Sequence, residues 1–250
     1  MLHEITAQDI RLLRERMGDG FGCPDVMQQI FYEVKKMEKE QVLTRITDTG
    51  VVAVVRAETA EKAKRISAAC LEGGVDAIEL TFTVPGAHKV IEELAATYQN
   101  GEIILGAGTV LDPETARIAI LSGAQYVVSP YFDPNTVKLC NRYRIACMPG
   151  CTTIKEVVNA MESGADIVKV FPGELFGPKI IKSIKGPIPH AKVMPTGGVD
   201  ITNVDQWIKA GAAAIGCGGA LTAGAKTGDY AAVTDMAKRL VAAVKEARGL

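Results

Sequence analysis

The sequence has few of the residues on which metal, nucleic-acid and membrane sites depend. It contains only three histidines, His3, His88 and His190, which lie far apart and have no metal-ligand spacing. Its net charge of −1 offers no positive surplus for nucleic acid or an anionic membrane. No apolar run has the length of a membrane span. We therefore expect no metal site and no nucleic-acid or membrane partner.

Neither a paired cysteine framework nor a secretory signal is evident. The first residues, Met1-Leu2-His3-Glu4, show no basic region followed by an apolar core. Cys147 and Cys151 flank Met-Pro-Gly, which is not a zinc knuckle. We expect reduced core thiols in a cytoplasmic protein. The six cysteines are scattered through apolar or helical stretches: Cys23, Cys70, Cys140, Cys147, Cys151 and Cys217.

What the sequence does contain is a regular alternation of short apolar runs and amphipathic helical stretches. The expected strands are 50–56, 75–83, 102–106, 125–129, 145–149, 166–171, 192–195 and 213–217. The clearest helical stretches are 59–72, 85–97, 113–122, 135–143, 153–163 and 202–210. Glycines follow several of these helices, and Asp-Pro or paired threonines open others, as helix termini require.

Eight strand–helix units with short loops favour one architecture. Such alternation implies a parallel sheet, and eight units in about 200 residues imply closure into a (β/α)8 TIM barrel. The alternative is an open doubly wound sheet. That fold would normally carry a glycine-rich dinucleotide fingerprint after its first strand, and Val55-Arg56-Ala57-Glu58 is not one.

Residues 1–44 precede the alternation and form a predicted N-terminal helical extension, with the barrel over 45–250. Residues 7–17 and 25–40 show helical patterning around a Gly- and Pro-rich breaker. We expect the apolar face of the second stretch to pack against the core or another subunit, with its last part covering the bottom of the barrel. A partner-specific docking helix is the alternative.

Lys169 is out of place in the apolar run Ile167-Val168-Lys169-Val170-Phe171-Pro172. A buried ammonium is costly, and a neutral lysine amine is a nucleophile that forms Schiff bases with carbonyls. Strand alternation places Lys169 inside the barrel, with the valines facing the helices. The alternative is a lysine at the strand edge that extends to water.

A carboxylate is expected in the same interior. Alternation along the second strand turns Glu79, Thr81 and Thr83 inward. An imine-forming lyase needs an amine to create the electron sink and a carboxylate to move protons. A buried ion pair without catalysis is the other interpretation, although such pairs seldom add net stability.

The remaining strand ends suit a small anionic substrate. Arg56, at the end of the first strand, has the planar charge that binds carboxylates. Glycine-rich turns follow the seventh strand, in Pro195-Thr196-Gly197-Gly198, and the eighth, in Gly216-Cys217-Gly218-Gly219. Turns at these positions usually cradle phosphate in barrels, but they are also ordinary turn sequences.

Together these segments resemble a known family over about residues 46–248. The chain is similar to the 2-keto-3-deoxy-6-phosphogluconate (KDPG) / 4-hydroxy-2-oxoglutarate (KHG) aldolases. Lys-x-Phe-Pro combined with Pro-Thr-Gly-Gly makes the resemblance specific. The segments that carry it are Glu79-Leu80-Thr81-Phe82-Thr83, Gly106-Ala107-Gly108-Thr109-Val110, Val128-Ser129-Pro130, Met148-Pro149-Gly150, Lys169-Val170-Phe171-Pro172 and Pro195-Thr196-Gly197-Gly198-Val199.

The resemblance implies a metal-free class I aldolase without a cofactor. Such an enzyme cleaves a 2-keto-4-hydroxy acid to pyruvate and an aldehyde (glyceraldehyde 3-phosphate or glyoxylate), usually as a homotrimer. It implies that Lys169 forms the Schiff base and that Glu79 is the general acid/base. The implied substrate-binding residues are Arg56 and Thr109 for the carboxylate, Pro130 and Phe171 for pocket shape, Thr196 at its strand end, and Gly197, Gly198, Gly218 and Gly219 for a phosphate.

Three features depart from the family pattern. Some members carry arginine where this chain has Thr83, which leaves more of the carboxylate binding to Arg56. Some have serine near positions 219 and 220, where Gly219 and Ala220 stand here, so a phosphate would rely on backbone N–H groups. The N-terminal extension is also longer than the usual lead-in.

Two other functions remain open at this point. One is a different phosphate-binding barrel enzyme, such as a sugar-phosphate isomerase or an indole-type synthase, with lysine as an acid. The other is a scaffold barrel that assembles through its N-terminal helices and has a vestigial pocket. The combination of Lys169, Glu79 and Arg56 favours the aldolase.

Overall fold

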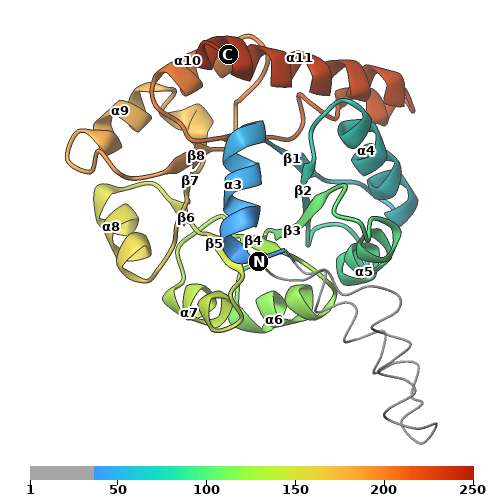
Figure 1. Cartoon of the computed structure of the whole chain (residues 1–250), viewed down its shortest axis with the longest axis horizontal. Coiled ribbons are helices and arrows are strands. Elements are labelled where there is room, and N and C mark those ends of the chain that lie inside the picture. The colour runs from blue at the N-terminus through green and yellow to red at the C-terminus, as the bar shows by residue number, and fades with distance from the viewer. Residues whose placement is uncertain (1–36) are drawn as a thin grey trace, which may run out of the picture. The chain divides into compact units, whose positions relative to one another are not determined.

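The computed structural model describes residues 37–250, which form one compact unit. The expected helix over 7–17 and most of the expected helix over 25–40 lie outside the described residues. Within 37–250, strands line a central ring and helices surround it (Figure 1). The chain thus forms the (β/α)8-type barrel that the alternation predicts.

All paired strands run parallel. One sheet has the order β5-β4-β3-β2-β1-β9 and the other β6-β7-β8. A bridge between Thr196 and Gly216 joins β8 to β9. Pro149 lies between β5 and β6, and its carbonyl accepts a hydrogen bond at 2.9 Å from the N–H of Lys169 on β7. β5 and β6 together occupy the fifth position, interrupted at Pro149. The strands are β1 (Val51–Val55), β2 (Ala77–Thr81), β3 (Ile104–Gly108), β4 (Tyr126–Val128), β5 (Ala146–Met148), β6 (Gly150–Cys151), β7 (Val168–Val170), β8 (Val193–Pro195) and β9 (Ile215–Cys217).

The helices begin where the sequence provides side-chain caps. Thr59, Asp112 and Asp133 each accept a hydrogen bond from a first-turn N–H, and Thr153 forms a capping box with Glu156. None of the helices in residues 37–250 combines the length and apolar character that crossing a membrane requires. The helices are α3 (Lys39–Thr49), α4 (Ala60–Glu72), α5 (Ala87–Thr97), α6 (Pro113–Leu121), α7 (Pro134–Arg142), α8 (Ile154–Glu162), α9 (Lys179–Lys185), α10 (Val204–Lys209) and α11 (Tyr230–Arg248), with 3₁₀ turns η2 (Gly173–Leu175) and η3 (Ala223–Lys226).

Alternation along the strands separates two apolar layers. Outward residues such as Val168 and Val170 pack against the surrounding helices. Inward residues such as Ile104, Tyr126 and Ile167 fill the barrel interior in a second, smaller cluster. This division follows from the two-residue period of a strand, and it leaves only a few inward positions for polar chemistry.

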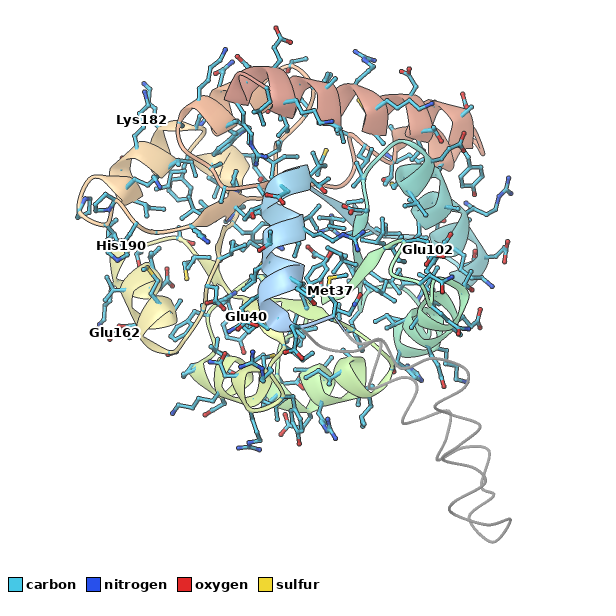
Figure 2. All side chains as sticks on the ribbon, viewed as in Figure 1. Met37, Glu40, Glu102, Glu162, Lys182 and His190 are labelled. Atoms are coloured by element: carbon cyan, nitrogen blue, oxygen red, sulfur yellow. The ribbon has the colours of Figure 1, made fainter. Side chains whose placement is uncertain are left out.

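Helix α3 covers one end of the barrel (Figure 1). Val42 and Ile46, one turn apart, are fully buried in the interior cluster. Arg45 binds the Asp76 carboxylate at 2.7 Å, just before β2. Figure 2 shows Met37 just before this helix and Glu40 in its first turn.

Most of the covering helix, residues 41–49, lies beyond the expected helix over 25–40. It begins after Glu38, which forms a capping box with Gln41, and ends at Gly50 in the left-handed region with φ 73°. The expected boundary between residues 44 and 45 falls inside α3.

The cysteines of the described region are free and buried, as a core role requires. Burial raises the pKa of Cys70 to about 12, and burial followed by the charge of Glu156 raises the pKa of Cys151 to about 12. These thiols are therefore protonated near neutral pH and poor nucleophiles. Cys23 lies outside the described residues.

The packing of α3 predicts a stability difference between its two faces. Ile46→Ala removes a fully buried side chain and should lower the free energy of unfolding by about 2–5 kcal/mol. Thr44→Ala changes an exposed residue of the same helix and should stay within about 0.5 kcal/mol of the parent. Urea denaturation measures both. Equal effects would show that α3 does not pack into the barrel.

Candidate functional site

Lys169 and Glu79 meet inside the barrel. Lys169 is the inward residue of β7, and Glu79 is an inward residue of β2. Their side chains are almost completely buried, with residue exposures of 3% and 1%. Lys169 Nζ lies 3.9 Å from Glu79 Oε1, so the structure places together two residues that are 90 positions apart.

The pair is close without being hydrogen-bonded. In residues 37–250, neither carboxylate oxygen of Glu79 has a hydrogen-bond partner. The Phe171 ring lies beside the ammonium, with Nζ 5.0 Å from the ring centroid. Buried polar groups that lack partners are costly, so a pair in this state is typical of a site that completes its hydrogen bonds with a substrate.

A cavity of about 380 Å³ opens at the carboxyl ends of β1, β7, β8 and β9. It contains seven of the residues that the sequence analysis singles out. The Thr196 hydroxyl is buried at its edge and has no hydrogen-bond partner among the described residues. The predicted residues in the cavity are Arg56, Phe171, Thr196, Gly197, Gly198, Gly218 and Gly219.

Lys169 and Glu79 do not line this cavity themselves, but Phe171 lines it and also lies beside Lys169 Nζ. Thr109 and Pro130 do not line it either. They follow β3 and β4 at the same end of the barrel. Thr109 has φ 56°, in the left-handed region, which is a strained conformation for a β-branched residue. Strain of about 1–3 kcal/mol usually persists only where the surrounding structure needs it, so Thr109 remains a candidate binding residue.

Sequence reasoning did not anticipate two acidic residues in the cavity, Glu174 and Asp200. Glu174 is on the 3₁₀ turn after β7 and extends over the Gly197–Gly198 turn. A methyl group on Gly197 would lie 1.9 Å from Glu174 Oε2. Nothing in the local sequence indicates this contact, because it depends on how two separate loops fold over the barrel end.

The donor set in this site is an amine, carboxylates, a guanidinium and backbone N–H groups. In the part of the chain that the structure describes, no group of three His, Cys, Asp or Glu side chains is arranged as metal ligands would be. The arrangement has a nucleophile, a neighbouring proton carrier and anion-binding groups. It can therefore carry out covalent chemistry on a carbonyl compound that bears negative charge.

Comparisons with known proteins identify similar sequences and folds. A family model described as "KDPG and KHG aldolase" matches residues 42–236. The 2-dehydro-3-deoxy-6-phosphogalactonate aldolase of Escherichia coli is 34% identical over 69% of this chain and 84% of its own length. The 2-dehydro-3-deoxy-phosphogluconate aldolase of Treponema pallidum is 34% identical over 76% of this chain and 90% of its own.

A solved structure reported as native KDPGal is similar in both sequence and fold. It is 32% identical and superposes with a TM-score of 0.75, covering 80% of this chain and 96% of the other. The family match begins within α3, ends within α11 and includes every strand that supplies a candidate site residue. The chain therefore belongs to the KDPG and KHG aldolase family and is a lyase.

Proposed function

We propose that this protein is a class I aldolase that cleaves a 2-keto-4-hydroxy acid to pyruvate and an aldehyde through a Schiff base on Lys169. The observation that carries the proposal is the buried pair, with Lys169 Nζ 3.9 Å from Glu79 Oε1. Family membership supports the reaction type. The charge and burial of these two side chains support the mechanism.

Lys169 acts first. Glu79 takes a proton from the Lys169 ammonium, and the neutral amine then attacks the C2 ketone of the substrate. The C–N bond forms as the ketone π bond breaks, and one proton moves from the nitrogen to the oxygen to give a carbinolamine. Glu79 donates a proton as water leaves, which gives the iminium. The iminium nitrogen then draws the electrons of the C3–C4 bond when that bond breaks. Phe171 keeps this region apolar, because its ring covers the lysine nitrogen.

Glu79 moves the protons of the later steps. It takes the C4 hydroxyl proton, directly or through a water, as the C3–C4 bond breaks and the aldehyde leaves. The enamine that remains is protonated at C3, and hydrolysis of the imine releases pyruvate and the free amine. One carboxylate can serve each step in turn because every proton that it accepts is later returned.

Arg56 and Thr109 are the proposed carboxylate-binding residues, with Pro130 and Phe171 shaping the pocket. Arg56 lines the cavity, and its guanidinium forms no salt bridge among the described residues. Its guanidinium is therefore available for a bidentate contact with a substrate carboxylate. Thr83 does not take over this contact, because its hydroxyl is already hydrogen-bonded to the Thr81 hydroxyl at 2.7 Å.

The glycine turns after β8 and β9 are the proposed site for a substrate phosphate. Gly197, Gly198, Gly218 and Gly219 line the cavity, where backbone N–H groups can approach an anion without side-chain hindrance. Two relatives are named for phosphorylated sugar acids, one a galactonate and one a gluconate. We propose a phosphorylated 2-keto-3-deoxy sugar acid as the preferred substrate class, with 4-hydroxy-2-oxoglutarate as the unphosphorylated alternative.

We further propose a homotrimer. Apolar side chains are exposed around α6, with Ile118 at 47% and Leu121 at 68% exposure, and Leu111 and Tyr131 are also exposed nearby in sequence. A group of this kind on a surface is typical of an interface between subunits. Light scattering of the full chain gives the mass directly.

The proposed mechanism predicts the effects of single substitutions on aldol cleavage. Lys169→Met should lower turnover by about 10³-fold or more, because no imine forms. Glu79→Gln should lower it by about 10²–10⁴-fold. Pyruvate release from KDPG, coupled to lactate dehydrogenase and NADH oxidation in the presence of EDTA, measures both. Lys182→Met is the control, since Lys182 is exposed on α9 at the periphery (Figure 2). Full activity in Lys169→Met would rule out the mechanism.

A second prediction tests the position of the carboxylate. A methyl group on Gly108 would lie 2.1 Å from Glu79 Oε1, so Gly108→Ala must displace that oxygen. We expect cleavage to fall by about 10–100-fold, because small misplacements of catalytic groups are costly, while the fold persists. Gly186→Ala is the matched control, with its nearest neighbour at 3.5 Å. Unchanged cleavage in Gly108→Ala would show that the reaction does not use this carboxylate position.

A third prediction concerns the phosphate. KDPG should be cleaved with a kcat/KM at least about tenfold above that of its unphosphorylated analogue, since a well-made anion contact contributes at least that much. Glu174→Gln should raise kcat/KM for KDPG only, because it removes a negative charge from the cavity. Equal kcat/KM values for both substrates would exclude the phosphate site and favour the unphosphorylated class.

A further inference from the structure

Tyr126 is a buried polar residue that the mechanism above leaves without a role. Its side chain is fully buried in the interior cluster beside Val128 and Met148. Its hydroxyl has no hydrogen-bond partner among residues 37–250. Buried hydroxyls are nearly always hydrogen-bonded, so an unpaired one at the centre of an enzyme barrel requires an explanation.

The strand register places Tyr126 at the level of Glu79. Glu79 of β2 pairs with Gly106 of β3, and Gly106 pairs with Tyr126 of β4. Gly106 has no side chain, and the tyrosine ring occupies that space. A methyl group there would lie 2.2 Å from two ring carbons. The ring therefore crosses β3 in the direction of β2, the strand that carries Glu79.

Electrostatics agree with that direction. Burial raises the pKa of Tyr126 well above its ordinary value, and the negative charges of Glu79 and Asp76 raise it further. Both carboxylates belong to the β2 side of the barrel. Asp76 already accepts hydrogen bonds from Arg45 and Thr49. The Glu79 oxygens accept no hydrogen bond in the described residues. Of these two carboxylates, Glu79 is therefore the one that lacks a donor.

We propose that Tyr126 is a positioning residue whose hydroxyl donates a hydrogen bond to one enclosed water molecule, which in turn donates to Glu79. A phenol can donate and an ionised carboxylate can only accept, so the two groups are complementary. Anchoring Oε2 from the interior leaves Oε1, the oxygen 3.9 Å from Lys169 Nζ, for proton transfer. This inference rests on the proposed function and assigns Glu79 a partner within it.

Exchange of the pyruvate methyl protons with D₂O tests the proposal, because each exchange requires the enamine and a proton carrier but no aldehyde. Proton NMR follows it in the full chain. In Tyr126→Phe we expect the rate at saturating pyruvate to fall about tenfold, the effect of losing a hydrogen bond to a charged group. The half-saturating pyruvate concentration should stay within about twofold, since Tyr126 does not touch the substrate. Tyr143→Phe, which removes the same hydroxyl from an exposed ring, should behave as the parent.

The outcomes separate the two proposals. If the parent protein shows no exchange, the proposed function fails, and this inference fails with it. If the parent exchanges and Tyr126→Phe exchanges equally fast, only the role of Tyr126 is overturned. A joint change in rate, half-saturation and melting temperature would indicate a packing role and would also overturn it. Adding Tyr126→Phe to Glu79→Gln should cause no further loss, because the hydroxyl acts through the carboxylate.

Discussion

The removal of Lys169 and Glu79 from water is the constraint on which the rest of the site depends. A buried amine and carboxylate lose their hydration, and their mutual attraction seldom repays that loss. The two groups are 3.9 Å apart, with the Phe171 ring on one side and apolar strands around them. Such a pair is retained because an imine-forming reaction needs a nucleophile and a proton carrier in a dry space.

The barrel meets this constraint by allocating its inward positions. Deep in the interior, apolar side chains fill the space and α3 closes the end. One level higher, β2 and β7 contribute the charged pair. Higher still, the loops after β1, β8 and β9 provide Arg56 and the glycine turns around the cavity. The charged pair and the anion-binding groups therefore lie toward the carboxyl ends of the strands, and the packed interior excludes water from the end that α3 closes.

Most of the fold could be predicted because it depends on local pattern. Two-residue alternation separated inward Lys169 from outward Val168, and threonine and aspartate caps marked the helix starts. Most of the covering helix, residues 41–49, was not predicted, because its apolar face is short and its burial depends on the barrel beneath it. Proline marks the break at residue 149 because it has no N–H for the ladder, but the return of Gly150 and Cys151 to the sheet depends on their pairing with β7.

The site was less predictable than the fold wherever it depends on contacts between distant segments. Lys169 and Arg56 stand out by charge in apolar runs. The placement of Glu174 over Gly197 depends on two loops meeting. The path of the Tyr126 ring across Gly106 depends on register between β3 and β4, which alternation within one strand does not specify. The left-handed backbone of Thr109 likewise reflects its surroundings, because threonine does not favour it.

The most direct test of this account is to locate the covalent intermediate. The protein is incubated with pyruvate and borohydride in the presence of EDTA, and digested peptides are mapped by mass spectrometry. A Schiff-base mechanism at this site predicts a reduced pyruvyl adduct on Lys169 that requires both reagents and does not form in Lys169→Met. An adduct confined to another lysine, or none in the folded protein, would contradict it.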